Sequence, residues 1–243
     1  AAALALSACG SDSSGAANAG PLFQPTPTTA KDSPAGTPGK PKQAAKPAGT
    51  LSAELLRPAG LYSSPGGKRV ARLSTRTEWK SPRLLPVVAR KGQWLGVISA
   101  QMPNNRTGWI RNRGLRFYRS PYALQVQRGA RKLVIRKNGR VLSRITVAVG
   151  RPGHETPLGV FGVTDKLLIK KYTPYGCCAI ATSAEQPNIP QGWGGGDRIA
   201  IHATSDPASI GQAVSLGCIR APTDVMERLV RQIPLGTRVT VTA

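Results

Sequence analysis

The chain has 243 residues, 40% of them hydrophobic, and its 34 basic and 11 acidic side chains give a formal net charge of +23. This length suits one ordinary domain plus a smaller one with chain left over, and it argues against a single fully packed domain. Nucleic acid, anionic membrane surfaces and acidic wall polymers all attract such a charge, so charge alone does not select a partner.

The first nine residues indicate the compartment. Leu-Ser-Ala-Cys at residues 6–9 follows Ala and Leu, precedes Gly-Ser, and resembles the lipobox of a bacterial lipoprotein. We therefore interpret residues 1–8 as the remnant of a signal peptide and Cys9 as the lipidation site. The alternative is an alanine-rich end with a chance cysteine. The lipobox interpretation predicts an extracytoplasmic, membrane-anchored lipoprotein facing the cell wall, without nucleic acid as a natural partner.

Residues 9–50 contain almost no large apolar side chains and are rich in Ser, Ala, Gly, Pro, Thr and Lys. Such a segment cannot form a core, so we expect a disordered linker that its prolines keep semi-extended. Its length suits a spacer that holds the folded part away from the membrane.

Residues 51–119 consist of short apolar runs broken by turn residues, which indicates a small all-β unit. Trp94 and Trp109 lie in two segments separated by the polar turn MPNNR. These segments resemble the paired tryptophan strands of bacterial Src-homology-3-like barrels. Because such tryptophans usually line a core or a groove, we expect a binding or spacing module.

Residues 120–243 begin with a predicted β-hairpin. Apolar segments at 133–136 and 145–149 flank Asn138-Gly139, a dipeptide that favours a tight hairpin turn. Pro157 and Gly159 then precede an alternating strand at 160–163.

The remainder of this region predicts two further strands and one helix. A strand in DRIAIHAT ends at His202, and a loop follows through Cys218. Thr223 is expected to cap a helix whose apolar face contains Val225, Met226, Leu229, Val230 and Ile233. The terminal segment 238–243 is expected to form an edge-like strand.

The order TPLG, YG, IHAT and SLGCIR over residues 120–243 resembles the L,D-transpeptidase catalytic (YkuD-type) domain. Its signature places a histidine upstream of Ser-His-Gly-Cys, and it is matched here by His202, Ser215, Gly217, Cys218, Ile219 and Arg220. Leu216 replaces the usual second histidine, and Ala203 replaces a glycine or serine. The resemblance implies a mainly β fold, a β-sandwich with a short helix after the cysteine, in an exported enzyme that acts on peptidoglycan stem peptides.

The residues of this motif suit acyl transfer, which needs a nucleophile, a base and oxyanion donors. Cys218 follows a glycine on a loop, where the Gly217 and Cys218 amides can point at one locus. A charged His202 would lower the thiol pKa and hold a thiolate ready. Arg220 projects to the same side as Cys218 and can hold a substrate carboxylate, although a solvated loop arginine is the alternative.

Several neighbouring residues have weaker assignments. Ser215 and Tyr175 are candidates for substrate binding, and Trp193 for the rim of the cleft. His154 lies in a polar turn. Adjacent Cys177 and Cys178 are interpreted as small buried thiols, with a vicinal disulfide as the minority alternative, because strand neighbours face opposite sides. The spacing of these groups does not match a zinc site, so no metal and no cofactor are expected.

Three functions remain open at this point. The first is an L,D-transpeptidase that passes an acyl group from Cys218 to the amine of a second stem peptide. The second is an L,D-carboxypeptidase or hydrolase of the same fold, in which water resolves the thioester. The third is a non-catalytic wall-binding lipoprotein that grips anionic cell-wall polymers, for which Leu216 is the best support.

Overall fold

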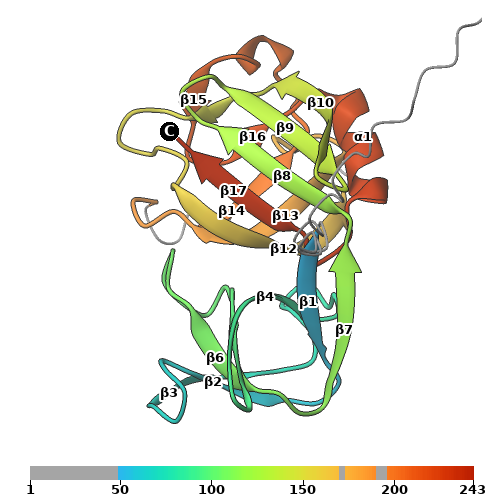
Figure 1. The fold of residues 1–243 in the computed structure, drawn as a ribbon. Helices are drawn as coiled ribbons and strands as arrows, with labels where there is room; N and C mark the ends of the chain where they lie inside the picture. Colours follow the sequence, from blue (N-terminus) through green and yellow to red (C-terminus); the bar gives the residue numbers. More distant parts are fainter. Residues whose placement is uncertain (1–48, 170–172, 190–195) are drawn as a thin grey trace, which may run out of the picture. The chain divides into compact units, whose positions relative to one another are not determined.

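The computed structural model describes residues 49–169, 173–189 and 196–243, which are mainly β (Figure 1). The predicted signal remnant, Cys9 and nearly all of the predicted linker lie outside the described residues. Within the described ranges there is one α-helix, and no helix is long and apolar enough to cross a membrane.

The N-terminal module is built on one sheet with the strand order β3-β2-β6-β5-β4-β1-β7. Its strands are β1 (Thr50–Leu55), β2 (Ala59–Tyr62), β3 (Arg69–Leu73), β4 (Leu84–Lys91), β5 (Trp94–Val97), β6 (Gly108–Arg111) and β7 (Leu115–Ser120). The apolar runs of the sequence thus form strands, and a separate cluster of buried side chains, mostly leucines, makes up the core of the module.

The two tryptophan segments form the adjacent antiparallel strands β5 and β6, with Gly96 opposite Trp109. Trp94 is buried, and its ring lies edge-on to Tyr62 with the centroids 5.1 Å apart. The Arg111 guanidinium lies 4.5 Å from the centroid of the same ring. Trp94 therefore packs within the module, as expected for a core tryptophan.

The C-terminal region forms an eight-stranded sheet with the order β10-β9-β8-β17-β12-β13-β14-β16. Its strands are β8 (Tyr122–Gln127), β9 (Lys132–Lys137), β10 (Arg140–Thr146), β12 (Gly159–Leu168), β13 (Cys178–Glu185), β14 (Arg198–His202), β16 (Ile219–Arg220) and β17 (Arg238–Thr242). A second, two-stranded sheet pairs β11 (Val149–Gly150) with β15 (Ala213–Ser215), and a 3-10 turn, η1, covers Pro207–Ser209.

The predicted hairpin is confirmed. Strands β9 and β10 pair on either side of Asn138 and Gly139, which have φ values of +51° and +81°. Two consecutive positive φ values are the geometry that asparagine and glycine tolerate in a tight hairpin turn.

The predicted edge position of the terminal strand is wrong, because β17 lies inside the sheet between β8 and β12. It pairs in parallel with β8 and antiparallel with β12 (Figure 1). Val239 and Val241 are buried in the core, whereas the alternate residues are less so. Sequence alternation shows which face of a strand is buried but does not show how many neighbours the strand has.

Helix α1 (Thr223–Gln232) buries the predicted apolar face against the core, with Met226 and Ile233 fully buried. The predicted cap differs, since Pro222 occupies the N-cap position and Thr223 is the first helical residue, with no side-chain capping bond. Strand β16 ends at Arg220, two residues before this proline, and Thr223 lies inside the first turn, so its hydroxyl is not at the capping position.

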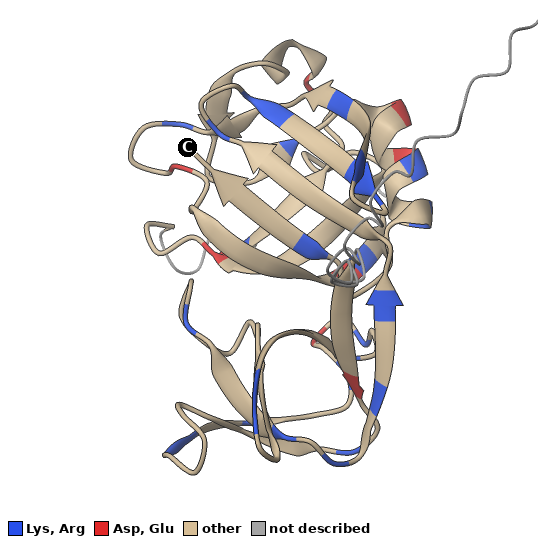
Figure 2. Cartoon of the chain, viewed as in Figure 1, with Lys and Arg blue, Asp and Glu red and all other residues tan. Residues whose placement is uncertain are grey.

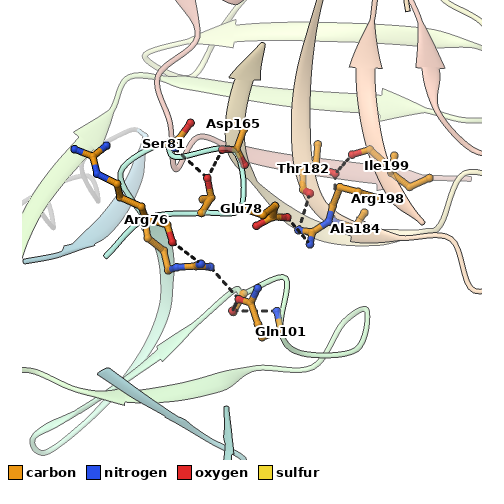
Figure 3. Close-up of polar contacts among 12 residues, drawn as sticks. Arg76, Glu78, Ser81, Gln101, Asp165, Thr182, Ala184, Arg198 and Ile199 are labelled. Atoms are coloured by element: carbon orange, nitrogen blue, oxygen red, sulfur yellow. Dashed lines mark hydrogen bonds and ion pairs between the residues drawn. The ribbon is translucent and has the colours of Figure 1, made fainter. Parts of the chain in front are cut away.

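The two sheets are joined by hydrogen bonds from polar side chains. Ser52 Oγ donates to the Gly236 carbonyl oxygen at 2.7 Å. Asn104 makes a pair of bonds to the Glu185 backbone, donating to its carbonyl oxygen at 2.6 Å and accepting its N–H at 3.0 Å. Thr77 Oγ1 donates to the fully buried Asp165 carboxylate, which is labelled in Figure 3. These bonds tie the N-terminal module to the eight-stranded sheet and to the turn before β17.

Truncating Met226 tests the packing of α1. Met226→Ala leaves a cavity in the core and should lower the free energy of unfolding by about 2–5 kcal/mol. Arg228→Ala on the exposed face loses only an i,i+4 pair with Asp224 and should change it by less than about 0.5 kcal/mol. Urea unfolding of both variants checks this, and equal effects would contradict the assigned buried face.

Candidate active site

The short parallel pairing of β14 with β16 brings the candidate catalytic residues together. Ile201 lies opposite Ile219 and His202 opposite Arg220, so the last residue of β14 is placed beside the chain that follows Cys218. The Ala221 N–H donates to the His202 carbonyl oxygen at 2.9 Å. Both isoleucines are buried in the core, and their packing there holds the two strands together.

The loop before β16 is shaped by its own hydrogen bonds and by one glycine. Ser215 Oγ donates to the Cys218 carbonyl oxygen at 2.6 Å and accepts the Gly217 N–H at 3.1 Å. Gly217 has a φ of +116°, and a Cβ there would lie 2.7 Å from Gln186 Nε2. Only glycine fits this position without strain. The Gly217 amide, which we expected to face a substrate, is bonded to Ser215 instead.

Thr156 holds the same loop from the other side. Its Oγ1 donates to the Gly217 carbonyl oxygen at 2.8 Å and accepts the Gly150 N–H at 3.0 Å, and the residue is fully buried. Sequence reasoning did not single out Thr156, because a threonine 61 positions before Gly217 carries no local signal of this contact.

The Cys218 thiol faces backbone groups of β14. Its sulfur accepts the Ala200 N–H at 3.4 Å and lies 4.0 Å from the Arg198 carbonyl oxygen. Burial raises the pKa of Cys218, while the Ala200 N–H and the positive charge of Arg220 act in the opposite direction with smaller effect. The thiol is therefore favoured over the thiolate at neutral pH.

The imidazole of His202 is buried, and its Nδ1 bonds to the carbonyl oxygen of Ala203. Burial lowers the pKa of His202 to about 4; the Ala203 bond opposes this shift, and the charge of Arg220 adds to it. The ring is therefore neutral at physiological pH, and Nε2 is the nitrogen left for proton transfer.

These two shifts correct the expected thiolate–imidazolium pair. His202 is buried and Cys218 is half-buried, so the charged forms lose solvation, and the positive Arg220 disfavours a second cation beside it. The resting site holds a neutral thiol and a neutral imidazole. A neutral His202 can accept a proton, so it suits general-base catalysis at the moment of attack.

Arg220 and Tyr175 lie where the sequence analysis expected them. The Arg220 side chain is one-quarter exposed, and its Nη1 is 3.8 Å from the exposed Asp206 carboxylate, a weak ion pair that leaves the guanidinium available. The Tyr175 ring lies edge-on to His202 with 4.8 Å between the centroids. Burial, together with the nearby Cys218, raises the pKa of the Tyr175 hydroxyl.

A pocket of about 120 Å³ brings these residues into one site. Its lining comprises Pro174, Tyr175, Ile189, Arg198, His202, Ser215, Leu216, Cys218 and Arg220. The structure thus places the predicted nucleophile, base and arginine around one cavity. It adds Arg198, which sequence reasoning missed, since this arginine is one of many in a basic chain and its strand position alone does not reveal its neighbours.

The remaining candidates lie outside this pocket. His154 is half-buried in a turn, and its Nδ1 has no partner among the described residues. Cys177 and Cys178 are free thiols with sulfurs 2.6 Å apart, because Cys177 lies in the turn before β13 rather than within the strand. Burial raises the pKa of Cys178 to about 12. Trp193 lies outside the described residues. Among the residues that the structure describes, no cluster of three or more side chains could hold a metal ion.

Comparison with known proteins shows the family of the C-terminal region. Residues 121–241 match the sequence profile of the L,D-transpeptidase catalytic domain. The chain is 34% identical over 124 residues to YkuD of Bacillus subtilis (strain 168), a protein named as a candidate L,D-transpeptidase, covering 51% of this chain and 68% of that one. It is also 34% identical over 131 residues to L,D-transpeptidase YqjB of the same organism, covering 50% and 71%.

Solved structures give weaker likenesses. The catalytic domain of the L,D-transpeptidase from E. faecium is 25% identical, with a TM-score of 0.37, over 50% of this chain and 96% of that domain.

Slow alkylation of Cys218 is expected from its raised pKa. Only the thiolate reacts with iodoacetamide, so at pH 7 Cys218 should react more slowly than cysteine in a short unstructured peptide, whose thiol pKa is about 8.5. Peptide mass mapping after timed labelling locates and quantifies the modification. Fast labelling of Cys218 at pH 6 that disappears in His202→Ala would instead support the thiolate–imidazolium pair.

Proposed function

Since the chain belongs to the L,D-transpeptidase catalytic domain family, we propose that it joins peptidoglycan stem peptides through an acyl-enzyme on Cys218, with His202 as the base. The observation that carries this proposal is the single pocket lined by Cys218, His202 and Arg220. A thiol beside a neutral imidazole and a cation has the parts that acyl transfer requires.

In the first half-reaction the Cys218 thiol gives its proton to His202 while the sulfur attacks the carbonyl carbon of the donor stem peptide at an L,D bond. The C–N bond breaks, the leaving amine takes the proton from His202, and a thioester remains. In the second half-reaction an amine of the acceptor stem attacks the same carbon. The C–S bond breaks, and the amine proton passes through His202 back to the thiolate.

Arg220 and the backbone of the loop stabilise charge in these steps. Arg220 is partly exposed in the pocket and can bind a carboxylate of the donor stem. The Gly217 N–H is already bonded to Ser215. We therefore assign the oxyanion to the Cys218 amide, with the Arg220 charge adding positive potential. Ser215 acts by holding the loop in this conformation.

Leu216 occupies the position of the usual second histidine and lines the pocket. It offers no group for proton transfer, so this position is not required by the mechanism above. The leucine adds apolar surface beside Cys218, which favours the neutral thiol and imidazole.

We further propose that the enzyme works at the cell wall as a lipoprotein. Support comes from the sequence: the lipobox-like residues before Cys9, the linker at 9–50, an SH3-like module at 51–119 and a catalytic domain at 120–243. Figure 2 shows Lys and Arg spread over strands of both sheets and over the helix, with few acidic residues. Such a surface suits contact with anionic cell-wall polymers.

Acylation of Cys218 is the first outcome to test. Incubation with a purified stem tetrapeptide should give a covalent adduct by intact mass, absent in Cys218→Ala and retained in Cys177→Ala, which also loses one thiol. His202→Ala should slow acylation by about 10²–10⁴-fold, the usual contribution of a general base. With a stem-peptide amine present the product should be the cross-linked dimer. Release by water alone would indicate a carboxypeptidase, and no adduct a non-catalytic wall-binding protein.

The pH dependence of acylation follows from the His202 pKa of about 4. As the pH rises through that value His202 loses its proton and becomes a base, so the rate should rise near pH 4 and then level off through neutral pH. Single-turnover acylation from pH 3.5 to 8 measures this profile. A rate that falls between pH 6 and 8 would show that a charged His202 is the active form.

Binding to isolated cell walls should weaken with salt. If the basic surface makes the contact, added salt should weaken it. Exposed charges attract each other only within a Debye length, which is about 8 Å at physiological ionic strength and shortens as salt is added. Pelleting assays across a salt series measure the bound fraction. Salt-insensitive binding would favour a carbohydrate groove near Trp94 and Trp109 over charge.

A further inference from the structure

A hollow lies beside the Cys218 pocket because one face of β13 and β14 carries only small side chains there. Ala179 is opposite His202, and Ala181 is opposite Ala200, so the register places three methyl groups next to the imidazole on the same face of the sheet. Alternate residues of a strand face the same side, and neighbouring strands align them. A floor of alanines leaves room above the sheet for a ligand.

The walls around this floor enclose about 190 Å³. They are formed by Trp79, Leu167, Ile169, Tyr175 and Arg198, with Ala179, Ala181 and Ala200 as the floor; we call these residues the Trp79 groove. Tyr175 and Arg198 also line the Cys218 pocket, so the two cavities adjoin at these side chains. Together they reach roughly 300 Å³, the lower end of the range for ligand sites.

Trp79 comes from the N-terminal module, in the connection between β3 and β4, and the two residues before it are docked on the catalytic sheet. Glu78 Oε1 accepts a hydrogen bond from Arg198 Nη2 at 3.1 Å (Figure 3). Thr77 bonds to the buried Asp165. Two polar contacts at adjacent residues fix the path of the chain, so Trp79 is held at the rim by its neighbours.

Arg198 is constrained on both sides. Its Nη1 donates to the Thr182 carbonyl oxygen at 3.4 Å while Nη2 is paired with Glu78, and its side chain is only 14% exposed. Its buried Nε has no hydrogen-bond partner among the described residues. An arginine held in this way presents a fixed positive charge at the junction of the two cavities, which can orient a ligand there.

We propose that the Trp79 groove is the subsite for the acyl acceptor, a second stem peptide bound in extended form, and that the N-terminal module completes it. This inference rests on the proposed function. The donor must reach the Cys218 sulfur and Arg220, and both line the first pocket but not the groove. The transfer step needs a second peptide whose amine approaches the thioester from the adjoining space.

The surface of the groove fits such a peptide. The methyl floor admits a backbone with small side chains, and the Trp79 ring, 41% exposed, offers an apolar face at the rim. Removal of this ring should therefore weaken the acceptor step while leaving donor acylation much less affected. A small amine without a peptide needs no groove and serves as the internal comparison.

The test uses the full chain, a stem tetrapeptide as donor, and either a stem-peptide amine or glycinamide as acceptor. In Trp79→Ala the stem-peptide concentration for half-maximal cross-linking should rise about tenfold, the order expected when an apolar pocket wall is lost. Transfer to glycinamide and the rate of Cys218 acylation should stay close to the parent values. Trp79→Phe should restore most of the stem-peptide preference.

Phe117→Ala is the matched control, since Phe117 is an equally exposed aromatic residue on β7, 44% against 41%, and does not line the groove. It should behave as the parent does, and thermal unfolding shows whether each variant is folded. If Trp79→Ala is acylated normally and keeps the stem-peptide preference of the parent, the proposed subsite is wrong while the proposed function stands. A loss confined to donor acylation would also overturn the subsite, whereas no acylation in the parent would overturn the proposed function and this subsite with it.

Discussion

The pairing of β16 with the end of β14 is the constraint on which the candidate site depends. Strand β16 has only two residues, yet it sets His202 beside the chain leaving Cys218. A pairing this short makes few hydrogen bonds, so the core beneath it and the loop before it must hold it in place. Buried Ile201 and Ile219 form the core beneath the pairing, and the hydrogen bonds of Ser215 and Thr156 hold the loop before it.

Burial at this pairing decides the protonation states of the reacting groups. Moving a thiolate and an imidazolium into a poorly solvated site costs free energy for each charge, and the neighbouring Arg220 adds a further cation. The neutral forms of Cys218 and His202 avoid this cost. In the proposed reaction, charge then develops only while the substrate is bound, when Arg220 and backbone donors can stabilise it.

The N-terminal module reaches the candidate site through its contacts with the eight-stranded sheet. The segment containing Thr77 and Glu78 reaches Asp165 on β12 and Arg198 on β14, and Arg198 lines the cavity of Cys218. Figure 3 shows the Glu78–Arg198 pair and, as a separate contact, the hydrogen bond at Asp165. A module joined in this way can shape substrate binding, in addition to any contact it makes with the wall.

Local sequence signals determined the parts of this protein that depend on near neighbours in the chain. Asn138-Gly139 determined a hairpin turn, the spacing of apolar residues determined the buried face of α1, and the SLGCIR motif singled out Cys218 with its upstream histidine. Only the tertiary structure decided the central position of β17, the neutral state of His202 and the place of Arg198 beside the thiol. Each of these depends on residues distant in sequence, because strand neighbours, desolvation and ion pairs arise only when the chain has folded.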